Sequence, residues 1–288
     1  MGKIYALFFA ILIVTTSFKP DKLAYLLYSP QGKPVKYSKM VRKIKNADII
    51  LFGESHHNPI SHWLQLELTN DLYETEKENL ILGAEMFESD NQIIMDEYLD
   101  SLISRNRFEA EARLWPNYST DYKPLMEFAK KKGLQFVATN IPRRYASIVN
   151  SKGFEGLDEL SDEAKAFLPP LPIPYDPNLK SYKSLLEMNE MHGHTGENFP
   201  KAQAIKDAAM AHFILQNWSS GKLFLHFNGS YHSDNYESIN WYLEQYNPGV
   251  EIVTITTVSQ EDISELLEEN EGKADFIICV DEDMTKTR

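Results

Sequence analysis

The sequence predicts an α/β protein, built on a mostly parallel sheet flanked by helices, with a helical, Pro-rich insertion. Short apolar runs rich in branched residues alternate with segments of helical spacing along most of the 288 residues. Such alternation is typical of a parallel sheet that is covered on both faces. No long flexible linker divides the chain, so we expect a single domain over residues 19–288.

Six short apolar runs are the predicted strands. Each is bounded by polar or turn-forming residues, as buried strands usually are. They are residues 47–52, 79–84, 134–139, 222–227, 250–258 and 276–280.

Helical spacing recurs between these runs. After Pro59, which suits the first position of a helix, Leu64, Leu68 and Leu72 can share one face. Gly133 is a typical helix stop. The predicted helices are residues 35–45, 59–76, 91–103, 122–132, 142–149, 180–191, 200–218 and 236–246.

The Pro-rich insertion covers residues 151–198. Its segment 168–178 contains too many prolines for regular structure. The segment is also too apolar for a flexible linker. It is either an ordered cover over another part of the protein or a plain crossover.

Residues 1–18 have the pattern of a signal peptide. Lys3 precedes an apolar run at residues 4–14, which is too short to span a bilayer comfortably, and small residues follow it. We expect an exported protein (periplasmic, cell-surface or secreted) whose mature chain begins between about residues 16 and 22. An uncleaved signal, which would associate the protein with a membrane, is the alternative.

Charge and cysteine content exclude several classes of protein. The net charge of −13 argues against a nucleic-acid partner. The single cysteine, Cys279, lies in an apolar run and excludes an intrachain disulfide and a multi-cysteine metal site.

Polar side chains follow four of the predicted strands. Glu54, His56 and His57 follow the first, Glu85 the second, Asn140 with Arg143 and Arg144 the third, and His232 the fourth. The carboxyl ends of parallel strands meet at one edge of the sheet, where α/β proteins place their ligand sites. Gly53 to His56 and Gly229 to His232 are both Gly-x-x-His directly after a strand. We therefore expect Glu54, His56, Glu85 and His232 to converge.

Two chemistries suit this set. His56, His232 and Glu85 could hold a divalent metal ion such as Zn, Mn, Fe or Co. Glu54, Glu85, His56 and His232 could equally act as general acids and bases without a metal. The alternative for Glu85 is a structural pair with an arginine. Arg143 and Arg144, in the first turn of a helix, favour an anion, with a solvated helix start as the alternative.

The sequence resembles the ChaN-like haem-binding uptake family, which is related more distantly to the Tiki/TraB proteases and the erythromycin esterases. The ordered motifs that carry this resemblance are Gly53-Glu-Ser-His56 with Asn58-Pro59 and His62, Glu85-Met86 with Gln92, Ala138 to Tyr145, Ala202 to Ala211, and Asn228 to His232. They cover roughly residues 47–245. His57 departs from the family pattern, in which aspartate is common.

The resemblance implies an exported, iron-related protein that binds haem. It also implies a tyrosine as the haem ligand, and Tyr145, beside Arg143 and Arg144, is the candidate. His192 and His194 form a second candidate iron or haem site, with solvated histidines as the alternative.

Other polar residues have weaker assignments. His62 lies one turn past Asn58, either behind the site or in solvent. Asp207 lies on one face of the 200–218 helix with Gln203 and either faces the pocket or caps a neighbouring element. His212 and His226 lie in apolar patterns and are predicted core histidines.

Two functions remain in competition. The first is an exported haem- or iron-binding protein of iron uptake, and the second is a metal-dependent hydrolase of the Tiki or esterase kind. The partner is haem or another small molecule. The oligomeric state is left open, with a homodimer as one alternative.

Overall fold

A computed structural model describes residues 22–191 and 196–287, and within them one sheet of seven strands organises the chain. The strand order is β1-β7-β6-β2-β5-β3-β4, and only the β1–β7 pair is antiparallel. The strands are β1 (Tyr25–Tyr28), β2 (Ile49–Glu54), β3 (Leu80–Glu88), β4 (Phe136–Asn140), β5 (Leu223–Gly229), β6 (Ile252–Gln260) and β7 (Phe276–Asp281). The predicted α/β class with a mostly parallel sheet is confirmed.

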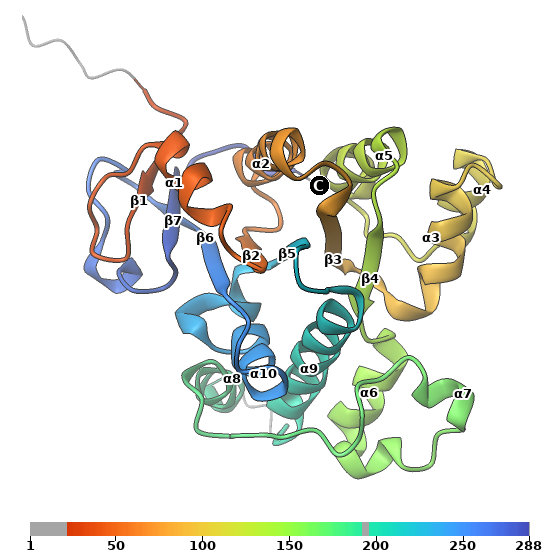
Figure 1. Ribbon diagram of the computed structural model, residues 1–288. Helices are drawn as coiled ribbons and strands as arrows, with labels where there is room; N and C mark the ends of the chain where they lie inside the picture. The colour runs from red at the N-terminus through yellow and green to blue at the C-terminus, as the bar shows by residue number, and fades with distance from the viewer. Residues whose placement is uncertain (1–21, 192–195, 288) are drawn as a thin grey trace, which may run out of the picture.

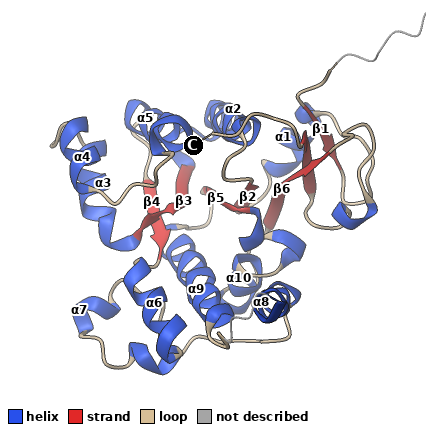
Figure 2. Cartoon of the chain, turned by 180° about the vertical axis from the view of Figure 1, so that it is seen from behind, coloured by secondary structure: helices blue, strands red, loops and turns tan. Residues whose placement is uncertain are grey.

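Helices lie on both faces of the sheet (Figures 1 and 2). They are α1 (Tyr37–Ile44), α2 (Pro59–Glu76), α3 (Gln92–Leu99), α4 (Arg105–Glu111), α5 (Lys123–Lys132), α6 (Arg143–Lys152), α7 (Asp162–Lys165), α8 (Lys180–Met191), α9 (Phe199–Asn217) and α10 (Ile239–Tyr246). The described helices include none that is long and apolar enough to cross a membrane.

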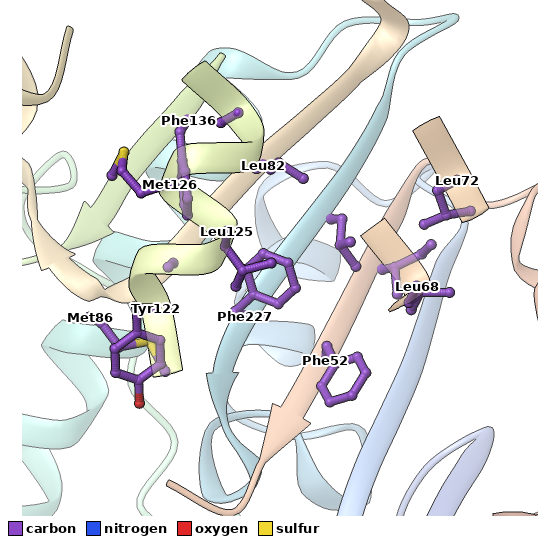
Figure 3. Packing of buried hydrophobic residues seen from close by; sticks show 14 of the residues in the cluster. Phe52, Leu68, Leu72, Leu82, Met86, Tyr122, Leu125, Met126, Phe136 and Phe227 are labelled. Carbon is purple, nitrogen blue, oxygen red and sulfur yellow. The ribbon is translucent and has the colours of Figure 1, made fainter. Parts of the chain in front are cut away.

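Alternate residues of each strand feed two separate cores. In β2, Ile50 and Phe52 pack with α1, α2 and α5, whereas Ile49 and Leu51 pack with α6, α9 and α10. Figure 3 shows the first core, where Leu68 and Leu72 of α2 lie over the sheet beside Phe52. The central strands are therefore buried on both faces, which explains their continuous apolar sequences.

Strand order brings the polar strand ends together. β2, β5 and β3 are consecutive neighbours in the sheet, and Glu54 of β2 pairs in register with Gly229 of β5. Glu85 lies within β3 rather than after it. The β3–β5 pairing ends at Ala84, and the β3–β4 register shifts between Ala84 and Glu88. Such irregularities re-aim side chains at the end of a ladder.

The structure also departs from the predicted elements. The edge strand β1 was not predicted, because four residues carry little periodic signal. The helix predicted over residues 91–103 ends at Leu99, since Ser101 has a φ of 64°, and α4 follows separately.

The Pro-rich segment belongs to the second core. Leu168 and Ile173 are buried there, and Tyr242 donates a hydrogen bond to the Pro174 carbonyl. Of the two predicted alternatives, an ordered cover and a plain crossover, the segment is an ordered cover, and what it covers is this second core. The predicted signal peptide and the pair His192 and His194 lie outside the described residues.

Candidate acid–base site

The first half of the site joins β2 to its following loop. His56 Nδ1 lies 2.9 Å from Glu54 Oε1. A carboxylate only accepts hydrogen bonds, so Nδ1 carries the proton and Nε2 is left to accept one. No hydrogen-bond partner of His56 Nε2 is found among the described residues. The His56 side chain is about a third exposed.

A buried shell fixes Glu54. Its Oε1 also accepts a hydrogen bond from the Tyr122 hydroxyl at 2.6 Å, and its Oε2 accepts one from Gln65 Nε2 at 2.5 Å. His62 is buried behind the loop, with Nε2 3.1 Å from the His56 carbonyl oxygen. Of its two alternatives, the position behind the site is the observed one. His57 is exposed and takes no part.

The second half joins β3, β5 and α9. His232 Nδ1 lies 2.5 Å from Asp207 Oδ1, and its Nε2 lies 3.3 Å from Glu85 Oε1. Glu85 Oε2 accepts a hydrogen bond from the Gly229 amide at 2.7 Å. The Tyr182 hydroxyl donates to Asp207 Oδ2 at 2.8 Å. His232 therefore bridges two carboxylates.

Gly229 lets the two halves meet. A Cβ at Gly229 would lie 2.6 Å from His56 Nε2 and 3.5 Å from Glu85 Oε2, so both groups occupy the space that a side chain would fill. The φ of Gly229 is −59°, which any residue can adopt. Gly53 is equally crowded, because a Cβ there would lie 2.9 Å from Ser230 Cα. The glycine of each Gly-x-x-His therefore allows neighbouring segments to pack closely and is not needed for a turn.

The two imidazoles titrate differently from free histidine. Burial alone would lower the pKa of His232, but the charges of Glu85 and Asp207 raise that pKa to about 10. Burial likewise opposes the charged form of His56, whereas the hydrogen bond with Glu54 and the charges of Glu85 and Glu54 raise its pKa. Burial would raise the pKa of Glu85, but the His232 charge holds it well below its usual range. Glu85 and His232 thus form a buried ion pair.

The predicted metal site is not supported. The described residues contain no group of three or more His, Cys, Asp or Glu side chains placed to hold a metal ion. Both ring nitrogens of His232 face carboxylates and carry protons, so neither offers a lone pair to a metal. Of the two histidines in the predicted metal set, only His56 has a ring nitrogen without a partner among the described residues.

The predicted haem residues lie beside this site but are occupied. Arg143 contacts Glu88, and Arg144 Nη1 lies 2.5 Å from Asp90 Oδ2. Tyr145 is buried, and its hydroxyl accepts a hydrogen bond from Arg144 at 3.1 Å. The Tyr145 hydroxyl and both arginines are thus held by neighbouring side chains in this structure, and their role toward haem stays a prediction.

A cavity of about 340 Å³ opens at the same sheet edge. Its walls include Glu85, Trp115, Asn140, Arg143 and Lys206. The ring centroid of Trp115 lies 5.1 Å from that of His56. The cavity thus adjoins the accessible imidazole. A larger cavity of about 600 Å³ is lined by residues such as Leu168 and His212 and contains none of the predicted site residues.

Several site residues were missed or left undecided. Asp207 was expected either to face the pocket or to cap a neighbouring element, and the structure places it against His232. Gln65 and His62 lie three residues apart in α2, so polar residues on a buried helical face could have indicated them. Tyr122, Tyr182 and Glu88 had no sequence signal. His226 is a satisfied core histidine as predicted, bonded to Thr139 and Asn228.

The protein is thus an α/β protein with two glutamate–histidine pairs at the carboxyl ends of three neighbouring parallel strands, the edge where such folds usually place ligand or catalytic sites. Comparison with known families makes this more specific. Residues 40–243 match the profile of the family described as "Haem-binding uptake, Tiki superfamily, ChaN". The chain belongs to this family.

Solved structures support the same fold. The structure described as "Cofacial heme binding to ChaN of Campylobacter jejuni" aligns with a TM-score of 0.64 and 18% identity, covering 88% of this chain and 96% of that one. The erythromycin esterase mutant EreC H289N aligns with a TM-score of 0.50 and 11% identity, covering 88% and 97%. Identities this low establish the shared fold alone.

One curated relative is much longer. Protein RETICULATA-RELATED 5, chloroplastic, from Arabidopsis thaliana is 24% identical over an alignment of 212 residues, which covers 69% of this chain and 28% of that protein. The chain therefore matches less than a third of that relative's length.

Proposed function

We propose that the polar strand ends form a metal-independent hydrolytic site, with His56 as general base. The observation that carries this proposal is the free Nε2 of His56, whose other nitrogen is held by Glu54 at 2.9 Å. A carboxylate that orients an imidazole in this way makes the far nitrogen more basic. That nitrogen can take a proton from a water molecule that attacks an ester or amide carbon.

The second pair has a different role. His232 is buried and protonated between Glu85 and Asp207, so it pairs with these two carboxylates and does not serve as a base. The two histidines are thus tuned apart by their surroundings, an arrangement typical of acid–base sites. The TM-score of 0.50 with an esterase supports a fold compatible with this chemistry.

Hydrolysis of 4-nitrophenyl butyrate tests the proposal. His56→Asn should lower kcat/KM by about 10²–10⁴-fold, the usual contribution of a general base. His57→Asn is the matched control, because His57 is the exposed neighbour, and it should leave the rate unchanged. In the wild type, kcat/KM should rise with pH through a pKa above 6.5, and EDTA should have no effect. Equal rates for both variants would overturn the assignment.

Haem binding is a second candidate function, favoured by a separate observation. The chain belongs to a family described by haem-binding uptake, and the ChaN structure from Campylobacter jejuni is described as one of cofacial haem binding. Hemin titration of the wild type should then give a saturable Soret shift. Tyr145→Phe should leave that shift in place, because the Arg144 side chain already holds the buried hydroxyl. A titration with no Soret change would remove this candidate.

Export and iron uptake belong to the haem candidate. The apolar run after Lys3 supports export. N-terminal sequencing of the protein from its native host should find a first residue between about 16 and 22. An intact Met1 on the protein in the cytoplasm would contradict export. Growth on hemin as the iron source, with and without the gene, tests uptake.

A further inference from the structure

The wall of the cavity beside His56 includes a residue with a polar atom that the described residues leave unsatisfied. Asn140 is 8% exposed and lines the cavity. Its Nδ2 donates to the Glu85 carbonyl oxygen at 3.0 Å, which fixes the orientation of the amide. Its buried Oδ1 has no hydrogen-bond partner in the described part of the chain. A buried acceptor without a donor is costly, so a ligand that supplies an N–H or O–H group gains affinity here.

A cation lies in the same wall. Lys206 of α9 is half-buried and forms no ion pair with any described residue. Its Nζ is 3.3 Å from Gln203 Oε1, a neutral group on the same helix. The ammonium group is therefore available to an anion.

The rim adds positive charge. Arg113 and Arg143 both contact Glu88, and Arg113 and Arg144 both contact Asp90. Three guanidinium groups thus face two carboxylates at the rim, and a third carboxylate, Glu85 in the cavity wall, is paired with the charged His232. An anionic group is favoured there despite the acidic chain as a whole.

Part of the cavity wall is apolar. Leu114, Trp115, Pro116 and Ile141 line the cavity, and the Trp115 ring packs edge-on against Tyr122 at a centroid distance of 6.1 Å. A fixed aromatic wall suits a flat or aliphatic ligand body.

We propose that this cavity binds a small molecule that combines an apolar body, a carboxylate or similar anion for Lys206, and a hydrogen-bond donor for Asn140. The inference concerns the ligand chemistry of the cavity and goes beyond the hydrolytic proposal. A carboxylate of this kind can belong to an acyl substrate or to a porphyrin propionate.

N-acetylphenylalanine has all three features and serves as the probe. Its amide, N-acetylphenylalaninamide, removes the charge, and 3-phenylpropionate removes the N–H donor. The wild type should bind the acid about tenfold more tightly than the amide, as one charge-assisted hydrogen bond implies. It should also bind 3-phenylpropionate more weakly than the acid. NMR titration with each probe measures these affinities.

Two lysine variants make the test specific. Lys206→Met should abolish the preference for the acid over the amide. Lys201→Met, on the same helix but outside the cavity wall, should keep that preference. Equal binding of acid and amide by the wild type, or the same loss in both variants, would overturn the proposal.

Two further experiments distinguish a porphyrin propionate from an acyl substrate as the source of the carboxylate. A hemin titration weakened by Lys206→Met but not by Lys201→Met assigns the anion site to propionates. A lower kcat/KM for a carboxylated 4-nitrophenyl ester in Lys206→Met, but not in Lys201→Met, assigns the anion site to acyl substrates. If the wild type hydrolyses no ester yet still prefers the acid, the hydrolytic proposal fails and this binding site stands.

Discussion

His232 is held more tightly than His56, because both of its ring nitrogens contact buried carboxylates. Its pKa of about 10 in the folded protein exceeds the ordinary value of 6.5. A raised folded pKa stabilises the protein fully below pH 6.5, and this stabilisation is lost as the pH rises through 10.

Chemical denaturation at pH 6.5 to 10.5 should therefore show a pH-dependent loss of stability in the wild type. The loss assigned to His232 should be on the order of a few kcal/mol. Tyrosines and lysines also titrate in this range, so the quantity to compare is the difference between the wild type and His232→Gln. Parallel pH curves for the two proteins would show that His232 is not charged in the native state.

Tyr122 tunes the other histidine. Glu54 Oε1 accepts hydrogen bonds from both the Tyr122 hydroxyl and His56 Nδ1. Tyr122→Phe keeps the buried ring and removes one donor, which leaves more negative charge facing His56. The pKa of His56 should rise further in this variant, as measured by NMR titration of the imidazole.

Tyr118→Phe is the matched control for this change. Tyr118 is also buried, but no hydrogen-bond partner of its hydroxyl is found among the described residues. Its replacement should leave the His56 titration where it is in the wild type. A lower His56 pKa in Tyr122→Phe would contradict the assignment of Tyr122 and His56 as two donors that share Glu54 Oε1.

At the scale of elements, the junction of β5 with its following turn decides the site geometry. Gly229→Ala would place a Cβ 2.6 Å from His56 Nε2 without any backbone strain, so the imidazole ring must move. We expect a folded protein with normal circular dichroism and an ester hydrolysis rate close to that of His56→Asn.

Gly249→Ala is the control for this glycine, because no atom lies within 4 Å of the added Cβ. It should be as active as the wild type. Full activity of Gly229→Ala would mean that His56 does not act from its observed position.

The elements also show how far sequence reasoning reaches. The helix predicted over residues 59–76 is α2 with the same bounds, because Pro59 and a side-chain cap by Asn58 mark its start locally. The convergence of Glu54, His56, Glu85 and His232 could be predicted from the rule that the carboxyl ends of parallel strands meet at one edge of the sheet.

Other contacts depend on packing that no local pattern encodes. Tyr122 reaches Glu54 across 68 residues of sequence, and Asp90 meets Arg144 across 54. The pairing of Arg143 and Arg144 with Glu88 and Asp90 could not be predicted, because these acids follow a register shift between β3 and β4 that no local pattern marks.

At the scale of the whole molecule, one sheet carries two cores. Leu68 belongs to the core on the α2 side and Leu243 to the core on the α9 side, and both are fully buried. The central strands contribute alternate residues to each core. Loss of packing on one face of the sheet should therefore disrupt the packing on the other face as well. The chain should unfold as one cooperative unit over both faces, as the predicted single domain requires.

Leu68→Ala and Leu243→Ala test this cooperativity with the same chemical change on opposite faces. Each should lower the free energy of unfolding by roughly 2–5 kcal/mol, because each deletes buried methyl groups and leaves a cavity. Urea denaturation followed by tryptophan fluorescence and by far-ultraviolet circular dichroism should give coincident, single transitions in both variants. Two separated transitions, with only one of them shifted by each substitution, would show instead that the faces unfold independently and that the chain contains two folding units.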